Sequence, residues 1–301
     1  MRIVIGSRGS ALALWQANWL RDHLAAAGHE VEVQVIRTSG DRLARVPLAR
    51  SGVKGLFVKE IEEALAGRSV DVAVHSFKDL PADLPPGLTI AAVPRREDPR
   101  DAYLSRDGKQ FDELPSGARV GTGSLRRLSQ LRYLRGDVEI TPIRGNVDTR
   151  LRKLERGDCD ALVLAAAGLI RLGRSSSIKH LFPPEQLCPA VGQGALAIET
   201  REGDGPIAEA VALIDDPVTH TAVRAERALL RRLGGGCAVP IAAYASASHG
   251  VLDMIGVVAR PDGSRLIRAQ ALGSSSDPDS LGLTLAEDLL HQGAGEILEA
   301  A

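Results

Sequence analysis

The residues best suited to chemistry are arginines at the starts of expected helices. In the segment GTGSLRR, residues 121–127, Ser124 is a natural N-cap, which places Arg126 and Arg127 in the first helical turn. The aligned peptide dipoles already give that turn about half a positive charge, so two further cations are disfavoured there. A bound anion would remove the conflict, because exposed backbone N–H groups and both guanidinium groups could donate to it.

Two other segments repeat this arrangement. In RGNVDTR, Arg144 precedes the expected cap Asn146, and Arg150 lies one turn into the helix. In GSRGS, Arg8 precedes the expected cap Ser10. The alternative for any one segment is a solvated helix start with salt bridges to nearby carboxylates, but three such segments favour the anion.

The kind of anion follows from the kind of cation. The chain has 31 arginines and 6 lysines, a bias that genomic base composition could explain by itself, although it would not explain these positions. The guanidinium fork donates two parallel hydrogen bonds to a planar carboxylate. Because neither GxGxxG nor GxxxxGK[ST] occurs in these segments, a substrate carboxylate is expected rather than a nucleotide.

The segment HSFKD, residues 75–79, follows a buried apolar strand. Asp79 could be an ordinary turn residue or helix cap. In a cleft crowded with arginines, however, it would be the group able to stabilise a transient cation. His75 is expected to be a hydrogen-bonded structural residue.

Three cysteines differ in their surroundings. Cys237 follows Gly234–Gly236, whose conformational freedom would leave the sulfur open for covalent chemistry. The alternative is a helix C-cap before a small buried residue. Cys159 precedes an apolar strand, and Cys188 has no assigned role. An odd number without a CxxC pair argues against a disulfide framework or a zinc site, and no metal is expected.

Composition excludes several classes of protein. The chain has 301 residues, a net charge of −1 and only 3% aromatic residues, so it has neither the charge nor the stacking side chains of a nucleic-acid-binding protein. The longest apolar run, residues 161–169, is too short to cross a membrane. The first ten residues lack the pattern of a secretory signal, so a cytoplasmic location is expected.

Strand-like runs alternate with helical patterns in the first two thirds of the chain. This rhythm predicts mixed, mostly parallel sheets covered by helices, in an α/β fold. Proline-rich seams at 94–99 and 183–194 divide it into two lobes, with residues 195–198 rejoining the first sheet. The expected strands are 3–5, 31–36, 70–74, 88–93, 138–141, 161–164, 241–245, 252–258 and 265–271, and the expected helices are 12–20, 56–66, 219–233 and 281–290.

Three domains are therefore predicted. The first comprises residues 1–95 and 195–216, the second residues 96–194, and the third residues 217–301, which form a smaller α+β unit with a hairpin at the PDG sequence, residues 261–263.

Taken together, these segments resemble the porphobilinogen deaminase family. The resemblance covers nearly the whole chain, and the set is far more specific than any one member. The matching segments are SRGSALALWQ, TSGD, KGLFVKE, VAVHSFKDLP, REDPRDA, GTGSLRR, IRGNVDTRL, GLIRLG, PAVGQGALAIE and GGGCAVPI.

The resemblance implies an enzyme that joins four porphobilinogens head to tail, with loss of ammonia, into the linear tetrapyrrole hydroxymethylbilane. It implies a dipyrromethane cofactor attached to Cys237 through a thioether, and a catalytic Asp79 that stabilises an azafulvenium cation. It also implies two lobes like those of periplasmic binding proteins, and a monomer.

The resemblance also assigns further site residues. Arg171 is associated with elongation, and Arg50, where some members carry lysine, and Lys54 belong to a mobile loop. The cofactor positions are Ser76, Lys78, Thr122, Ser124, Arg126, Arg127, Arg144, Asn146 and Arg150, and the substrate positions are Arg8, Ser10, Gln16, Phe57, Arg144, Arg150, Arg171 and Gln193.

The alternative function is a non-catalytic, two-lobed cytosolic protein that binds a carboxylate ligand. Such a protein would need the arginines but neither an exposed thiol nor Asp79. A covalent adduct on Cys237 would decide between the two functions.

Overall fold

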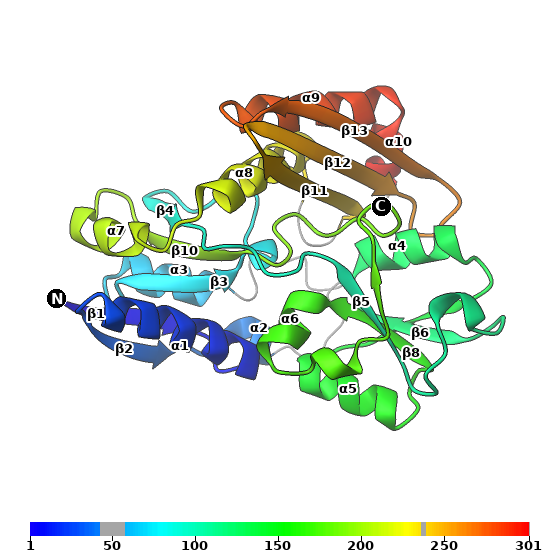
Figure 1. Ribbon diagram of the computed structural model, residues 1–301, viewed down its shortest axis with the longest axis horizontal. Coiled ribbons are helices and arrows are strands. Elements are labelled where there is room, and N and C mark those ends of the chain that lie inside the picture. The colour runs from blue at the N-terminus through cyan, green and yellow to red at the C-terminus, as the bar shows by residue number, and fades with distance from the viewer. Residues whose placement is uncertain (43–57, 236–238, 301) are drawn as a thin grey trace. The chain divides into compact units, whose positions relative to one another are not determined.

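The computed structural model describes residues 1–42, 58–235 and 239–300 (Figure 1). Four residues of the predicted site, Arg50, Lys54, Phe57 and Cys237, lie outside these ranges. The chain forms two compact units, one of residues 1–97 and 195–220, the other of residues 98–194 and 221–301. The second unit therefore contains most residues of the predicted second and third domains, and the three-domain division stays a prediction.

The first unit is built on a five-stranded sheet of order β2-β1-β3-β10-β4. β2, β1 and β3 run parallel, whereas β10 is antiparallel to both β3 and β4. The strands are β1 (Arg2–Ser7), β2 (Glu30–Val35), β3 (Val72–Ser76), β4 (Leu88–Ala92) and β10 (Leu196–Arg201).

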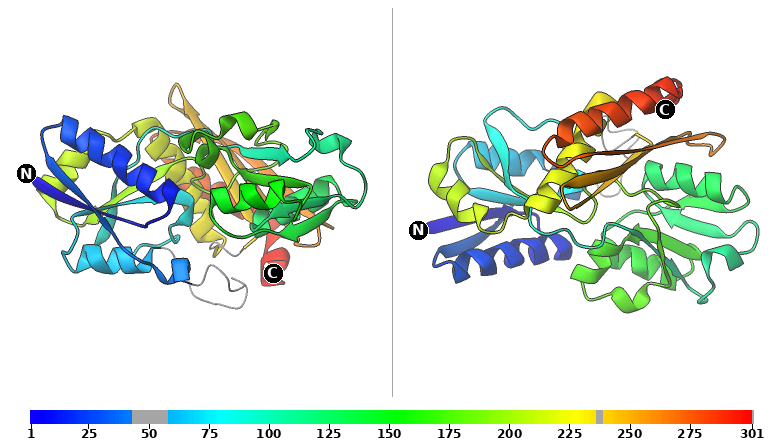
Figure 2. Two further views of the ribbon diagram at one scale, coloured as in Figure 1. Left: turned by 90° about the horizontal axis from the view of Figure 1, so that it is seen from below. Right: turned by 45° about the horizontal axis from the view of Figure 1, so that its top comes forward.

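Helices cover both faces of this sheet (Figure 2). Ala17, Leu20 and Leu24 of one helix pack on one face, and Ile61 and Leu65 of another pack on the opposite face. The elements are α1 (Ala11–Ala26), α2 (Ser39–Arg42), α3 (Lys59–Ala66), the 3-10 turn η2 (Phe77–Asp79) and α7 (Gly205–Ala212).

The first lobe of the second unit repeats this topology in the order β7-β6-β8-β5-β9. β7, β6 and β8 run parallel, and β5 is antiparallel to β8 and β9. The elements are β5 (Asp101–Ser105), η3 (Phe111–Glu113), β6 (Arg119–Thr122), α4 (Leu125–Leu134), β7 (Glu139–Pro142), α5 (Val147–Glu155), β8 (Ala161–Ala165), α6 (Ala166–Arg171), η4 (Ser175–Ser177) and β9 (His180–Phe182).

The rest of the second unit is a three-stranded antiparallel sheet of order β11-β12-β13. Leu229 and Leu285 of two helices pack against one face, and Ile255 of the other face packs against Cys188 of the preceding lobe. The elements are α8 (Pro217–Arg232), which begins in the first unit, β11 (Ile241–Ser248), β12 (Val251–Ala259), β13 (Leu266–Ser274), α9 (Pro278–His291) and α10 (Ala294–Glu299).

The α/β class, the return of residues 195–198 to the first sheet and the hairpin at 261–263 are confirmed. The mixed, mostly parallel sheets are confirmed too, because four strands of each large sheet run in one direction. Only the strand that enters after each seam, β10 or β5, runs against its neighbours. One detail of the prediction is wrong: β3 ends two residues later than predicted, so His75 and Ser76 belong to the strand.

Candidate functional site

A small hollow lies where β1 and β3 end in the first unit. It holds about 60 Å³ and gathers several side chains that the sequence analysis had singled out separately. Its polar lining comes from Arg8, Ser10, Gln16, His75, Ser76 and Asp79. Ligands of α/β sheets bind beyond the carboxyl ends of strands, so this is the expected place for a small-molecule site.

The residues around the hollow are fixed from several sides. Ser10 caps α1 by accepting a hydrogen bond from the Ala13 backbone N–H at 3.3 Å, as predicted. Gln16 Nε2 donates to Ser76 Oγ at 2.8 Å. Gln16 is buried because α1 turns Gln16, Ala17 and Leu20 toward the core.

Lys78 and Asp79 lie on the 3-10 turn that follows β3 directly. The Phe77 backbone N–H donates to the Ala195 carbonyl at 3.1 Å, and that of Leu80 donates to the Phe77 carbonyl. Both polar side chains are half-buried. The turn therefore holds a carboxylate and an ammonium at a fixed strand end.

In the second unit, α4 begins as predicted. Ser124 is its N-cap and accepts a hydrogen bond from the Arg127 backbone N–H at 3.4 Å. Arg126 and Arg127 occupy the first turn, but both are buried, with 4% exposure each. Thr122 at the end of β6 is also buried, and its Oγ1 accepts from the Ser124 backbone N–H.

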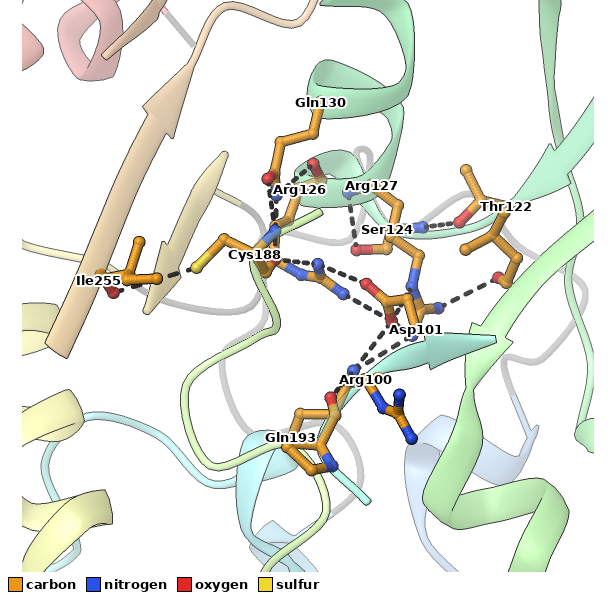
Figure 3. Close-up of polar contacts among 12 residues, drawn as sticks. Arg100, Asp101, Thr122, Ser124, Arg126, Arg127, Gln130, Cys188, Gln193 and Ile255 are labelled. Carbon is orange, nitrogen blue, oxygen red and sulfur yellow. Dashed lines mark hydrogen bonds and ion pairs between the residues drawn. The ribbon is translucent and has the colours of Figure 1, made fainter. Parts of the chain in front are cut away.

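Asp101 compensates the two guanidinium groups (Figure 3). Its Oδ2 lies 2.7 Å from Arg126 Nη1, and its Oδ1 accepts from Arg127 Nε at 2.8 Å. A bound anion was expected to remove the conflict at this helix start, but a buried carboxylate of the chain already does so. Two cations facing one anion still leave one positive charge in excess.

The ionisation of Asp101 follows from these contacts. Burial alone would raise the pKa of this carboxyl, since the charged form loses its hydration. Attraction by Arg126 and Arg127, together with their hydrogen bonds, outweighs burial and holds the pKa well below its usual range. Asp101 is therefore ionised at neutral pH and lies beside the N-terminus of α4.

Gln193 completes this buried network. Its Nε2 donates to Asp101 Oδ1 at 2.8 Å and to the Pro99 carbonyl at 2.7 Å, and its Oε1 accepts from Arg127 Nη2 at 3.2 Å. With both ends of its amide engaged and no exposed surface, Gln193 acts here as a structural link. Its predicted contact with substrate stays a prediction.

On its other side, α4 binds the segment that follows β9. Gln130 Nε2 donates to the Cys188 carbonyl at 3.0 Å, and Gln130 Oε1 accepts from the Cys188 backbone N–H at 2.8 Å (Figure 3). Arg126 also donates to the Cys188 carbonyl. This segment in turn contacts Ile255 of β12, so α4 is tied to the C-terminal sheet.

The arginine-containing loop before α5 lies beside the loop before α4. Asn146 is the predicted N-cap, accepting from the Thr149 backbone N–H at 2.9 Å. Arg150 Nε donates to the Gly145 carbonyl at 2.8 Å. A Cβ placed on Gly123 would lie 3.9 Å from Arg150 Nη2, which shows that the two loops are neighbours.

Arg144 and Arg171 lie further along the same unit. Arg144 is half-buried ahead of the Asn146 cap. Arg171 ends α6, and its Nη2 donates to the Gly194 carbonyl at 2.7 Å.

The two described cysteines are poor nucleophiles. Burial raises the pKa of the Cys159 thiol to about 11 and that of Cys188 to about 12. Both side chains have no exposed surface. Any covalent chemistry of a thiol would therefore fall to Cys237, whose structure lies outside the described ranges.

Asp101 and Gln130 were not among the residues predicted from the sequence. Asp101 had a signal, because it is a charged residue at the start of the otherwise apolar strand DAYLS, two residues after Pro99. Gln130 had none, because a glutamine on a helix is normally exposed. His75 was predicted to be a hydrogen-bonded structural residue, and its Nε2 does lie 3.0 Å from Glu199 Oε2.

Two classes of site find no support in the described part of the chain. Among residues 1–42, 58–235 and 239–300, no group of three or more histidine, cysteine or acidic side chains could hold a metal ion. Within the same ranges, none of the helices combines the length and the hydropathy that a membrane span requires.

The fold is similar to that of substrate-binding proteins of solved structure. The methionine-binding protein MetQ aligns over 71% of this chain and 89% of its own, with a TM-score of 0.47 and 14% identity. An arginine-specific periplasmic binding protein of Salmonella typhimurium aligns over 73% of this chain and 93% of its own, with a TM-score of 0.39 and 14% identity.

Sequence comparison is far more specific. Residues 3–209 match the family described as porphobilinogen deaminase, dipyromethane cofactor binding domain, and residues 220–291 match the C-terminal domain of the same family. The porphobilinogen deaminase of Syntrophobacter fumaroxidans is 52% identical over 99% of this chain and 97% of its own. That of Desulforudis audaxviator is 53% identical over 98% and 96%.

The chain is therefore an α/β enzyme, a transferase of tetrapyrrole biosynthesis. It belongs to the porphobilinogen deaminase family.

Proposed function

We propose that this protein condenses four porphobilinogen molecules head to tail, releasing ammonia at each step, to give hydroxymethylbilane. The condensation takes place on a dipyrromethane that is attached to Cys237 through a thioether. The observation that carries the proposal is the hollow at the end of β3, where Asp79 lies with Arg8, Ser10 and Gln16 in a chain of this family.

Asp79 is the proposed catalytic residue. The aminomethyl group leaves from its protonated, ammonium form: when its C–N bond breaks, ammonia departs with the bonding electrons, and the positive charge spreads over the pyrrole ring. A carboxylate held near the ring N–H stabilises that charge in a partly buried site. The β3 turn fixes Asp79 in place, so little reorganisation is needed as the charge develops.

The donor set of the second unit fits dipyrromethane, whose acetate and propionate arms carry four negative charges. The loops before α4 and α5 are neighbours, and together they present a net positive charge even after Asp101 is counted. When bound, the cofactor supplies the free pyrrole carbon onto which new units add. The residues proposed to hold it are Ser76, Lys78, Thr122, Ser124, Arg126, Arg127, Arg144, Asn146 and Arg150.

Substrate carboxylates are proposed to bind to a set that partly overlaps. Arg171 is assigned to elongation, and Arg50 and Lys54 to a mobile loop. The other proposed substrate residues are Arg8, Ser10, Gln16, Phe57, Arg144, Arg150 and Gln193. The proposal includes a monomeric, cytoplasmic enzyme that binds neither nucleic acid nor membrane.

Intact-protein mass spectrometry tests the tether. Purified protein should exceed its sequence mass by a two-pyrrole adduct, and Cys237→Ser should remove the excess together with the activity. Cys159→Ser is the matched control, and it should keep the adduct. Active protein of unmodified mass would refute the tethered cofactor. Unmodified protein without turnover would favour the alternative of a carboxylate-binding protein.

Asp79→Asn tests the catalytic assignment. The variant should keep the adduct, because fold and tether survive, yet lose most turnover, a fall of about 10²-fold or more, as is usual when one electrostatic stabiliser is removed. Asp83→Asn, four residues away, is the control for a nearby change of the same kind. Near-normal turnover of Asp79→Asn would remove Asp79 from its proposed role.

A further inference from the structure

β3 directs successive side chains to opposite faces of its sheet. Val72 and Val74 pack with the α1 side, whereas Ala73 packs with Ile61 of α3. Because side chains alternate along a strand, His75 faces α3, and Ser76 faces α1, where it accepts the hydrogen bond from Gln16. The last two residues of β3 are therefore held from opposite sides, immediately before the turn that carries Asp79.

The α3 side contains a buried cluster of ionisable groups. His75 Nε2 lies 3.0 Å from Glu199 Oε2, and the side chains are 4% and 0% exposed. Glu199 lies opposite Ala73 in the register of β10 with β3, which places it diagonally across from His75 on the same face. Glu62 of α3 is also buried, with 8% exposure.

The cluster is under-supplied with hydrogen bonds. Glu62 Oε1 and Glu199 Oε1 are both buried, and neither has a hydrogen-bond partner among the described residues. Two neighbouring carboxylates cannot both stay ionised in such a place at low cost. Burial, with repulsion from Glu199 added, raises the pKa of Glu62 to about 7, while His75 opposes the shift.

Burial and the neighbouring Glu199 side chain therefore favour the protonated form of Glu62, while His75 Nε2 and Glu199 Oε2 stay in contact at 3.0 Å. Arg8 and Asp79 line the hollow together with His75, so the cluster lies next to the hollow.

We infer that Glu62, His75 and Glu199 form a positioning cluster that fixes the end of β3, and with it the carboxylate of Asp79, for the reaction. The inference rests on the proposed function. The three residues act through the backbone of Ser76 and the following turn, and they do not touch the reacting atoms. The Gln16–Ser76 hydrogen bond holds the same strand end from the other face.

Paired substitutions at His75 test the inference. His75→Leu removes the donor to Glu199, whereas His75→Gln places an amide N–H near the former position of Nε2. In protein loaded with cofactor, His75→Leu should lower kcat at least 10-fold, with KM for porphobilinogen within twofold of wild type and the adduct retained. His75→Gln should recover most of kcat. Equal kcat in the Leu variant and wild type, or equal loss in both variants, would overturn the inference.

Glu199→Gln provides a second variant in case His75→Leu does not fold. It preserves shape but removes the charge, and it should lower kcat in the same way. Glu63→Gln on the exposed face of α3 is the matched control, and it should leave kcat unchanged. A Glu199→Gln variant that behaves like the Glu63→Gln control would contradict the role of the cluster.

Hydrogen exchange separates this inference from the proposed function. Wild-type protein that makes no hydroxymethylbilane would refute the proposed function. In that case, the hydrogen-exchange rates of the backbone amides of residues 76–80 still test whether the cluster holds the end of β3 in place. His75→Leu should raise their exchange rate at least 10-fold and His75→Gln should not, and unchanged protection in His75→Leu would refute the positioning role.

Discussion

Asp101 Oδ2 lies 2.7 Å from Arg126 Nη1, and neither side chain is more than 4% exposed. The same carboxylate contacts Arg127, so one anion holds two cations at the start of α4. This arrangement holds both guanidinium groups in place and leaves one positive charge in excess. The positions of Arg126 and Arg127 at the N-terminus of α4 therefore depend on a residue of β5.

Asp101→Asn should destabilise the protein and impair cofactor loading. The substitution leaves two buried guanidinium groups without a counter-charge, a change that typically costs about 3–5 kcal/mol. Asp137→Asn is the matched control, because it removes an exposed carboxylate that pairs with Arg135 in the same unit. It should change stability and cofactor loading little. Urea unfolding measures the loss of stability, and the intact mass of the purified protein measures cofactor loading. An Asp101→Asn variant as stable as the Asp137→Asn control would show that Asp101 is not the counter-charge.

Gly145→Ala should disturb the neighbouring loop without unfolding the lobe. Gly145 has a φ of +112°, which an L side chain rarely adopts, and an added Cβ would lie 2.6 Å from Thr149 Cγ2. The Gly145 carbonyl accepts from Arg150 Nε, so a shift of this backbone displaces Arg150. We expect kcat/KM for porphobilinogen to fall about 10-fold or more, because misplaced binding groups lose much of their effect.

Gly136→Ala provides the comparison for the glycine substitution. Gly136 does not have a positive φ, and the nearest atom to an added Cβ is the Arg132 carbonyl oxygen at 3.6 Å, an ordinary contact. Its kcat/KM should equal that of wild type. If both alanine variants behave like wild type, the conformation of Gly145 does not set the position of Arg150.

Thiol titration should count two reactive cysteines in the denatured, cofactor-loaded protein. The chain has three cysteines, and a thioether would block Cys237. In the folded protein at pH 8, Cys159 and Cys188 should not react within minutes, because their raised pKa values leave only about one thiol in 10³ or fewer ionised and both are buried. Three reactive thiols after denaturation of active protein would contradict the thioether.

Local sequence predicted much of the frame of the site. Ser10, Ser124 and Asn146 all cap the helices expected of them, because an N-cap depends on contacts within three residues. The strand before the second of these arginine loops, expected at 138–141, is β7, whereas β6 before the first was not among the expected strands. Arg126 and Arg127 were correctly placed in the first turn of α4.

The sequence did not reveal which residues pair with each other when they lie far apart along the chain. Asp101 precedes Arg126 by 25 residues, and His75 precedes Glu199 by 124. These pairs form only when β5 and β10 enter their sheets antiparallel, and the apolar pattern of a short buried strand does not reveal its direction. The counter-charge of the arginines and the cluster behind Asp79 were therefore invisible to local reasoning.

The buried acid Glu62 should make stability depend on pH in the near-neutral range. Its pKa is raised from 4.5 to about 7 in the folded protein, so between these values the folded state binds a proton that the unfolded state has released. Stability should therefore fall as pH rises from about 4.5 to about 7 and then level off. The full effect is at most about 3–4 kcal/mol, at about 1.4 kcal/mol for each tenfold change in the ionisation constant.

Urea unfolding of wild type, Glu62→Gln and Glu63→Gln at pH 5 and pH 8 measures this dependence. The neutral amide in Glu62→Gln cannot ionise, so this variant should lose less stability between the two pH values than wild type and should be the more stable protein at pH 8. Glu63→Gln should keep the wild-type dependence, because its carboxylate is exposed. The lowered pKa of Asp101 does not interfere, because its stabilisation is present above the ordinary value of 3.8 and is lost only at lower pH. An identical pH dependence in wild type and Glu62→Gln would show that Glu62 does not hold the proton of the cluster.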